Sequence, residues 1–316
     1  MPAQFNMKIF FGLVVLIGCV GFQTSLLADS FNGFDVRNSR VPPDEIHQGG
    51  PPRDGIPAID KPKFVKAARA SFLQANDRVL GLHYQGESKA YPVSIMNWHE
   101  IVNDKIRHQP VVVTFCPLCG SGVAFSAYAG KRALDFGVSG LLYNSDVLLY
   151  DRQTESLWSQ LLAQAVSGRL KGETLTMLPL EHTSWGDWVK RYPNTVVLSE
   201  ETGYRRDYDL DPYAGYENSE GTYFPVAHRD PRYHPKEKVL GIEVGGHYKA
   251  YPFAELSKTN GVVKDVVEGE SITVIYDVEN HAARAVDASG DALTGITAFW
   301  FAWIAFHPET SVFTTN

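Results

Sequence analysis

Val79-Leu80-Gly81-Leu82 recurs later in the chain as Val239-Leu240-Gly241-Ile242. The nearby segment Lys89-Ala90-Tyr91-Pro92 recurs as Lys249-Ala250-Tyr251-Pro252, and both blocks are displaced by the same 160 residues (239 − 79 and 249 − 89). Two blocks that return at one spacing indicate a duplicated unit rather than chance similarity.

A third block extends the pattern, since the apolar run 111–115 falls on residues 271–275 at the same spacing. We therefore expect an α+β, β-rich fold of two related halves packed as one large domain. The first half covers residues 63–195 and the second 236–316, and a connecting loop over 196–235 joins them. Residues 29–62, rich in Pro, Gly, Asn and Asp, form an extended entry segment.

Local patterns predict the elements inside each half. Residues 79–84 and 88–91 flank a turn at Gln85-Gly86-Glu87, as in a β-hairpin. Pro92 is suited to the first turn of a helix that continues to Glu100. A short amphipathic helix is expected over 183–191. The apolar run 296–306 is too short to span a membrane and fits a central core strand.

Composition excludes one class of partner. The 316-residue chain is 44% hydrophobic and 21% charged, with a formal net charge of −7. Nucleic-acid binding normally needs a basic surface, and no dense Lys/Arg cluster supplies one. We expect no nucleic-acid partner, and the remaining partners are an unidentified small molecule or protein.

The N-terminus has the pattern of an export leader over residues 1–28. Lys8 precedes an apolar stretch over 9–22, which is typical of a signal peptide. Leu16-Ile17-Gly18-Cys19 resembles a lipoprotein box, with Cys19 as the lipidated residue. Cleavage after Ala28 and an uncleaved membrane anchor are the alternatives. The sequence thus predicts an exported protein, periplasmic or tethered to the membrane through its leader.

Outside the leader, the only cysteines are those of Cys116-Pro117-Leu118-Cys119. A c-type haem is excluded because position 120 is Gly instead of His. Gly120-Ser121-Gly122 is a poor helix start, which disfavours a thioredoxin-type redox pair. A zinc site needs further ligands, and two thiolates with a His would also suit copper. A local structural disulfide is the competing interpretation.

The duplication predicts that the site lies on the first half, because the second half lacks its reactive groups. At the given spacing, the positions of Cys116, Cys119, His99 and Glu100 fall on Tyr276, Glu279, Thr259 and Asn260. His99 and Glu100 lie one strand before the cysteines, where they could act as ligand or general base. His307, at the end of the aromatic run, is the other candidate metal ligand.

A second polar cluster follows the cysteines in the sequence. The residue types suit a polar pocket, and the expected lining residues are Asp151, Arg152, Trp158 and Gln160. Asp151 and Arg152 could equally cap a turn. No nucleophile-elbow serine, phosphate loop or dinucleotide fingerprint is present, so nucleotide cofactors are not expected.

Several of these segments together resemble the bacterial domain-of-unknown-function 3179 family. The segments that carry the resemblance, in chain order, are 90–92, 99–104, 114–119, 136–140, 151–154, 156–160, 299–303 and 306–308. Ala163 departs from the family, which often has Gly there. The resemblance implies an exported protein whose Cys, His and Trp-Ser-Gln segments form a recurring set, and it supplies no activity.

The sequence therefore supports two functions of different classes. The first is a metal-binding or thiol-redox protein, with zinc or copper as the metal, centred on Cys116 and Cys119 with His99. The second is a non-catalytic extracytoplasmic binding or scaffold module with a local disulfide. Whether the protein is an enzyme is left open.

Overall fold

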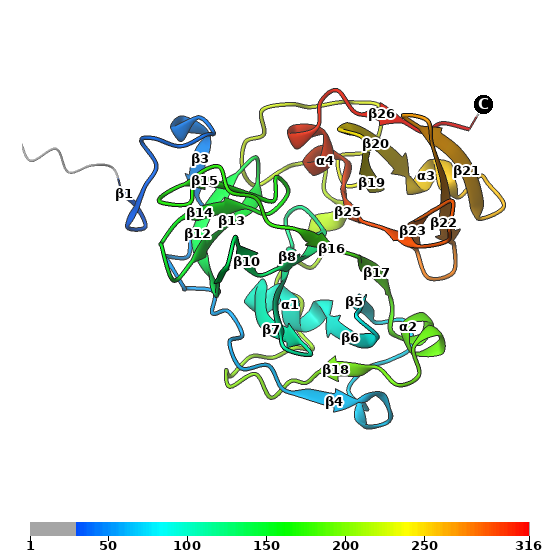
Figure 1. Ribbon diagram of the computed structural model, residues 1–316, viewed down its shortest axis with the longest axis horizontal. Helices are drawn as coiled ribbons and strands as arrows, with labels where there is room; N and C mark the ends of the chain where they lie inside the picture. The colour runs from blue at the N-terminus through cyan, green and yellow to red at the C-terminus, as the bar shows by residue number, and fades with distance from the viewer. Residues whose placement is uncertain (1–29, 316) are drawn as a thin grey trace, which may run out of the picture.

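The computed structural model describes residues 30–315, and strands dominate it: 42% of these residues are in strands and 12% in helices. Five small sheets are arranged like the blades of a five-bladed β-propeller (Figure 1). The expected leader and Cys19 lie outside the described residues. Within 30–315, no helix is both long and apolar enough to cross a membrane.

The five sheets are numbered 1 to 5. Sheet 1 contains β3 (Ile46–Gln48), β12 (Phe136–Tyr143), β13 (Asp146–Asp151), β14 (Leu157–Ser159) and β15 (Gln164–Ser167). Sheet 2 contains β7 (Ile101–Ile106), β8 (Gln109–Cys116), β9 (Ser121–Ser126) and β16 (Met177–Leu178). Sheet 3 contains β4 (Phe64–Lys66), β5 (Arg78–Tyr84), β6 (Glu87–Pro92), β17 (Leu180–Ser184) and β18 (Val196–Leu198). Sheet 4 contains β19 (Lys238–Val244), β20 (His247–Pro252), β25 (Gly295–Phe299) and β26 (Ser311–Val312). Sheet 5 contains β21 (Val262–Val267), β22 (Glu270–Asp277), β23 (Ala282–Asp287) and β24 (Ala292–Leu293).

The remaining elements are short. Two small hairpins pair β1 (Ser30–Phe31) with β2 (Phe34–Asp35) and β10 (Tyr128–Ala129) with β11 (Arg132–Ala133). The helices are α1 (Val93–His99), α2 (Trp185–Arg191), α3 (Phe253–Leu256) and α4 (Trp300–Phe306), and the 3₁₀ turns are η1 (Pro43–Glu45), η2 (Ala67–Arg69) and η3 (Tyr216–Asn218). None of the helices in residues 30–315 exceeds about two turns at 3.6 residues per turn, so they do not form a layer of their own.

The prediction of a two-half α+β domain is therefore wrong. Sheets 3 and 4 do share one strand order, with an antiparallel outer strand, a hairpin and a parallel strand. Sheets 2 and 5 also share one order. Sheet 1 has no counterpart among the other sheets. Its strands β12 to β15 lie in the chain between β9 and β16, two strands that belong to sheet 2. The matching blocks in the sequence thus belong to blades of a single ring, and an odd fifth blade prevents a division into two halves.

The predicted spacing of 160 residues holds for the two hairpins, but it is one residue larger for the strands that follow the helices. β5 pairs with β6, and β19 with β20, in the same register at a spacing of 160. Asp104 pairs with Val111, however, and Asp265 with Ile272, a spacing of 161 (272 − 111). One residue is inserted after the helix, where spacing is not constrained by strand pairing. Cys116 therefore matches Asp277 and not Tyr276.

Among the expected elements, the hairpin and the helix beginning after Pro92 are observed as β5, β6 and α1. The core strand expected over 296–306 is wrong: β25 ends at Phe299, and Trp300 begins α4. Six of the seven α4 residues are buried. A helix buried on all sides has no polar face, so its periodicity cannot be told from that of a buried strand.

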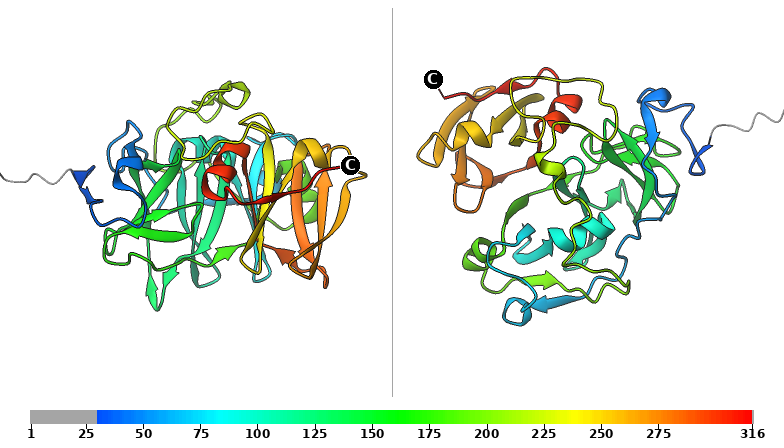
Figure 2. Two further views of the ribbon diagram at one scale, coloured as in Figure 1. Left: turned by 90° about the horizontal axis from the view of Figure 1, so that it is seen from above. Right: turned by 180° about the vertical axis from the view of Figure 1, so that it is seen from behind.

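The segment between β18 and β19 is a long loop that contains only η3. Figure 2 shows this yellow-green segment crossing one face of the molecule, over the ends of the sheets. Its aromatic residues Tyr213, Tyr216 and Phe224 pack against the largest apolar core, which contains Cys116 and Cys119. The loop therefore covers the cysteine pair.

Candidate functional site

The two cysteines lie at the end of the central strand of sheet 2. Cys116 ends β8, and the turn through Pro117 and Leu118 brings Cys119 back, with its amide donating to the Cys116 carbonyl at 3.2 Å. Gly120 follows at φ +58, a conformation that favours glycine. The ring of Phe299 lies 2.9 Å from the place a Cβ would take at Gly120, so a side chain there would also clash.

A tight turn in sheet 1 supplies a third side chain. β12 and β13 are joined by Asn144 and Ser145, at φ 51 and 65, and Tyr143 pairs directly with Asp146. Two positive φ values in a two-residue loop are typical of a type I′ hairpin turn, in which Asn is favoured. Asp146 is thereby the first residue of β13, and its carboxylate faces the cysteines.

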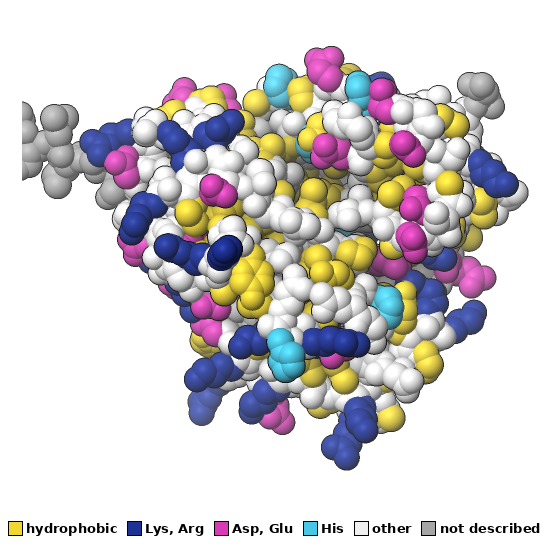
Figure 3. Space-filling model, in the orientation of Figure 1, with side chains coloured by type: hydrophobic (Ala, Val, Ile, Leu, Met, Phe, Trp, Pro, Cys, Tyr) yellow, Lys and Arg dark blue, Asp and Glu magenta, His cyan; other side chains and the backbone are white. Residues whose placement is uncertain are grey.

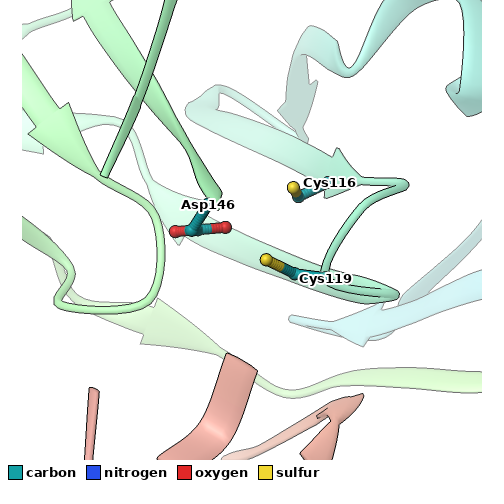
Figure 4. A group of neighbouring side chains, drawn as sticks. All are labelled: Cys116, Cys119 and Asp146. Carbon is teal, nitrogen blue, oxygen red and sulfur yellow. The ribbon is translucent and has the colours of Figure 1, made fainter. Parts of the chain in front are cut away.

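The three side chains converge in the interior. The sulfurs of Cys116 and Cys119 and a carboxylate oxygen of Asp146 all lie within 4.8 Å of one another, and all three residues are buried (Figure 4). The cysteines are free thiols, so no disulfide joins them. Both thiols donate to the Ser145 carbonyl, at 3.8 Å from Cys116 and 3.4 Å from Cys119.

The carboxylate of Asp146 is only half satisfied. Oδ2 accepts the amide of Leu161 at 3.1 Å. Oδ1 is buried and has no hydrogen-bond partner in residues 30–315. A buried acceptor without a partner costs about 1–3 kcal/mol, and more when charged. A bound cation would remove this cost, and the two neighbouring thiols are the ligands that zinc and related ions select.

Burial sets the protonation of these groups. It raises the pKa of Asp146 to about 7, against weaker lowering by the Leu161 and Val147 amides. Burial also raises the pKa of both thiols, and the Asp146 charge adds to that effect. Without a metal, burial thus favours the neutral forms of the acid and of both thiols, and a cation would convert them into its ligands.

Glu100 is a further buried acid beside this cluster. It caps α1 in the left-handed region at φ 57, unusual for a residue with a side chain. Burial raises its pKa to about 8, and the charge of Asp146 contributes. The carboxylate of Glu100 is therefore within electrostatic reach of the cluster, although its oxygens are not among the ligand atoms that lie within 4.8 Å.

His99 is not brought to the sulfurs. Its Nδ1 donates to the Pro57 carbonyl at 2.7 Å, and its Nε2 accepts from the Tyr208 hydroxyl at 2.7 Å. Because both ring nitrogens have partners, His99 holds α1 against two loops. His307 is also elsewhere: it stacks on Tyr248 with ring centroids 3.8 Å apart. Burial lowers the pKa of His307 to about 4.

The residues expected to line a polar pocket form structural hydrogen bonds instead. Asp151 accepts from the Thr154 amide and hydroxyl and, at 3.0 Å, from Trp158 Nε1. Arg152 forms an ion pair with Asp60 at 2.5 Å. Gln160 accepts from the Ser121 hydroxyl at 2.7 Å and donates to Thr114 Oγ1 at 2.8 Å. The Gln160 bonds join the end of β14 in sheet 1 to β8 and β9 in sheet 2, whereas the Asp151 bonds stay within sheet 1.

Sequence reasoning missed Asp146, the residue that completes the cluster. The Asn144-Ser145 pair is a recognisable turn signal, and it could have located the hairpin. Nothing local could have shown that this turn faces Cys116 and Cys119, because the contact joins two different sheets. Tyr216, whose buried hydroxyl has no hydrogen-bond partner in the described chain, was also missed.

Propeller-like sheets around a buried Cys-Cys-Asp group define a strand-dominated protein with a candidate metal centre. The chain belongs to the family described as "Protein of unknown function (DUF3179)", whose model matches residues 53–310. The resemblance noted from the sequence segments is thereby confirmed. No curated protein and no solved structure matches the chain.

Proposed function

We propose that this protein binds a zinc-type divalent cation through Cys116, Cys119 and Asp146. The observation that carries the proposal is the buried, unpartnered Oδ1 of Asp146 beside two free thiols. A mixed thiolate and carboxylate set suits a borderline-soft divalent ion better than Cu(I), which selects sulfur alone. Three protein ligands leave one position of a tetrahedral ion for another group.

The distances fit such an ion after a small contraction. Zinc bonds of about 2.0–2.3 Å place tetrahedral ligand atoms roughly 3.5 Å apart. The three atoms here lie within 4.8 Å of one another. Binding would therefore draw them together by about 1.3 Å at most.

A thiol-redox function is less well supported by the same site. A reactive cysteine needs a lowered pKa and access to its partner. Burial raises the pKa of both thiols, and both side chains are buried. The alternative of a scaffold module with a local disulfide predicts a closed S–S bond, which the free thiols do not favour. Export to an extracytoplasmic compartment remains part of the proposal.

Elemental analysis with thiol counting on the chain purified without residues 1–28, and so without Cys19, tests the metal proposal. We expect about one equivalent of metal per chain, and two free thiols once the metal is chelated under denaturing conditions. Cys116→Ser and Asp146→Asn should each lose the metal, while Asp291→Asn at an exposed position should retain it. Circular dichroism verifies that each variant is folded.

Two results would contradict the proposal. Wild-type protein without metal and without free thiols would favour the structural disulfide. Metal that persists at full stoichiometry in Asp146→Asn would show that the carboxylate is not a ligand, and the assignment of the site would then fail.

A further inference from the structure

A separate cavity lies between sheets 3 and 4, on the other side of the cysteine turn. Its volume is about 230 Å³. Residues of β5, β17, β19 and β25 form its walls, and Pro117 and Gly120 of the cysteine turn close one side. None of the three metal-ligand side chains lines it, so it is distinct from the candidate metal centre.

Two cations enter this cavity from matching positions. Arg78 is the first residue of β5, and Lys238 is the first residue of β19, 160 residues later (238 − 78). Arg78 pairs with Ser184, the last residue of β17, and Lys238 pairs with Phe299, the last residue of β25. Because the two sheets face each other across the cavity, their equivalent positions bring both charges to it.

The charge of Arg78 is not neutralised by a carboxylate. Its guanidinium donates to the carbonyls of Asn280 at 2.5 Å and His281 at 3.3 Å. Within residues 30–315, no carboxylate lies within 4.0 Å of it. Burial lowers the pKa of Arg78, and the charge of Glu217 offsets only part of that effect. A guanidinium has five N–H donors, so several remain for a ligand.

The acidic residues around the cavity do not satisfy both cations. Glu217 lies 3.5 Å from Lys238, but its side chain is 60% exposed and can turn to solvent. Asp211 forms no ion pair with either cation in residues 30–315, and its Oδ1 accepts from Asn97 Nδ2 at 3.1 Å and from the Tyr213 amide at 2.9 Å. An anion bound between Arg78 and Lys238 would therefore replace one ion pair, the exposed pair of Lys238 with Glu217.

His182 adds a neutral donor to the wall. The Gly122 amide donates to its Nε2 at 2.9 Å, which places the ring proton on Nδ1. The Nδ1–H group is the ring's remaining donor, and the residue lines the cavity. A donor of this kind suits an oxygen acceptor and cannot pair with a second cation.

Apolar side chains form part of the remaining walls, with Phe115, Phe299 and Val93 among the lining residues. The face shown in Figure 3, which also gathers hydrophobic side chains near its middle, is not the face that the long loop crosses. At about 30 Å³ per water, the volume corresponds to roughly eight waters, or a ligand of about ten non-hydrogen atoms. Apolar walls with a few convergent polar groups are typical of small-molecule sites.

We propose that this cavity binds a small organic carboxylate, with its carboxylate between Arg78 and Lys238 and its apolar part against Phe115 and Phe299. The proposal does not depend on the metal centre. Arginine presents two parallel N–H donors that match a carboxylate, which makes it the principal anchor.

Fluorine NMR titrations can test this site with 4-fluorobenzoate and its neutral analogue 4-fluorobenzamide. We expect saturable binding of the acid and at least about tenfold weaker binding of the amide. Arg78→Gln and Lys238→Gln should each weaken binding of the acid by about 10- to 100-fold, as for a lost charge-assisted hydrogen bond. Arg107→Gln, at an exposed position outside the cavity, should bind like the wild type.

Lys238→Gln guards against a folding artefact, because Lys238 pairs only with an exposed side chain whereas Arg78 supports two backbone carbonyls. Equal affinity for acid and amide, no saturable binding of the acid, or unchanged affinity in Lys238→Gln would each overturn the proposal. Binding that disappears in Cys116→Ser but survives in both cation variants would also overturn it, since the carboxylate would then be bound to the metal.

Discussion

Asp146 shows how one residue can acquire a role from its neighbours in space. In the sequence it is an ordinary acid after a turn signal. In the structure its carboxylate is buried, one oxygen lacks a partner, and two sulfurs lie beside it. The candidate site therefore depends on a residue that no local pattern singles out. The cysteines themselves were identifiable from the sequence because they are the only pair outside the expected leader.

His182 offers a test of pH dependence. Burial, together with the charges of Arg78 and Lys238, lowers its pKa from 6.5 to about 3. The neutral ring is favoured in the folded state, so its contribution to stability is complete above pH 6.5 and is lost as pH falls toward 3. The apparent melting temperature should fall over this range.

His182→Gln should flatten that acid dependence, because glutamine keeps an acceptor for the Gly122 amide and does not titrate. The exposed His108→Gln is the matched control and should melt like the wild type at each pH. Melting curves recorded at several pH values provide the measurement. An identical fall in the His182→Gln protein would show that other groups govern acid unfolding.

Helices α2 and α4 are each fixed to their sheet by the same kind of contact, a buried tryptophan. Trp188 of α2 donates to Thr195 at 2.9 Å, and Trp303 of α4 donates to Thr310 at 3.1 Å. Both indoles lie against a strand glycine. A Cβ at Gly81 would stand 2.3 Å from the ring of Trp188, and one at Gly241 would stand 2.2 Å from that of Trp303. The repeated Leu-Gly motif therefore records a close approach of helix to strand.

Gly81→Ala and Gly241→Ala should both be strongly destabilising. Each indole is buried and held by its hydrogen bond, so it cannot move to admit a methyl group. Overpacking of this kind costs about 1–3 kcal/mol, and we expect values at the upper end. Urea unfolding measures the change in free energy. Gly221→Ala is the control, since nothing lies within 4 Å of its added carbon, and equal stability of all three variants would refute the packing argument.

The β12–β13 turn is anchored to two other elements. Asn144 donates to the Ala305 carbonyl of α4 at 3.2 Å, and it accepts from the Ala227 amide of the covering loop at 2.8 Å. Its side chain thus joins sheet 1, α4 and the loop above the cysteines.

Asn144→Ala should loosen the covering loop, since a buried hydrogen-bonding group left unsatisfied costs about 1–3 kcal/mol. Amide hydrogen exchange should become faster at Ala227 and in the segment around Phe224. The exposed Asn218→Ala serves as control. Unchanged exchange at Ala227 in the Asn144→Ala protein would contradict this account of the anchor.

For the whole molecule, the expected export leader at the N-terminus lies outside the described residues. We expect the exported chain to lose residues 1–28, or to carry lipid on Cys19. Intact mass of the protein purified from a bacterial host distinguishes the two, and Cys19→Ala should release a lipoprotein from the membrane fraction without altering a chain cleaved after Ala28. A full-length chain in the cytoplasm would contradict export.

Short-range signals made several elements predictable. The Gln85-Gly86 turn and the helix after Pro92 both follow from residues adjacent in the chain. The α4 segment was assigned wrongly because a fully buried apolar run carries no periodic signal. The number of blades also could not be derived, since sheet 1 is built from strands without a copy elsewhere in the chain.

The sequence by itself determined the strand-rich character, the matched motifs of sheets 3 and 4, and the position of the one cysteine pair. Only the tertiary structure decided that five sheets form one ring, that Asp146 faces Cys116 and Cys119, and that Arg78 and Lys238 share a cavity. Turn chemistry and strand alternation act over a few residues, whereas these contacts depend on how whole sheets pack. Burial and shape of the complete chain select that packing, and no short segment contains the information.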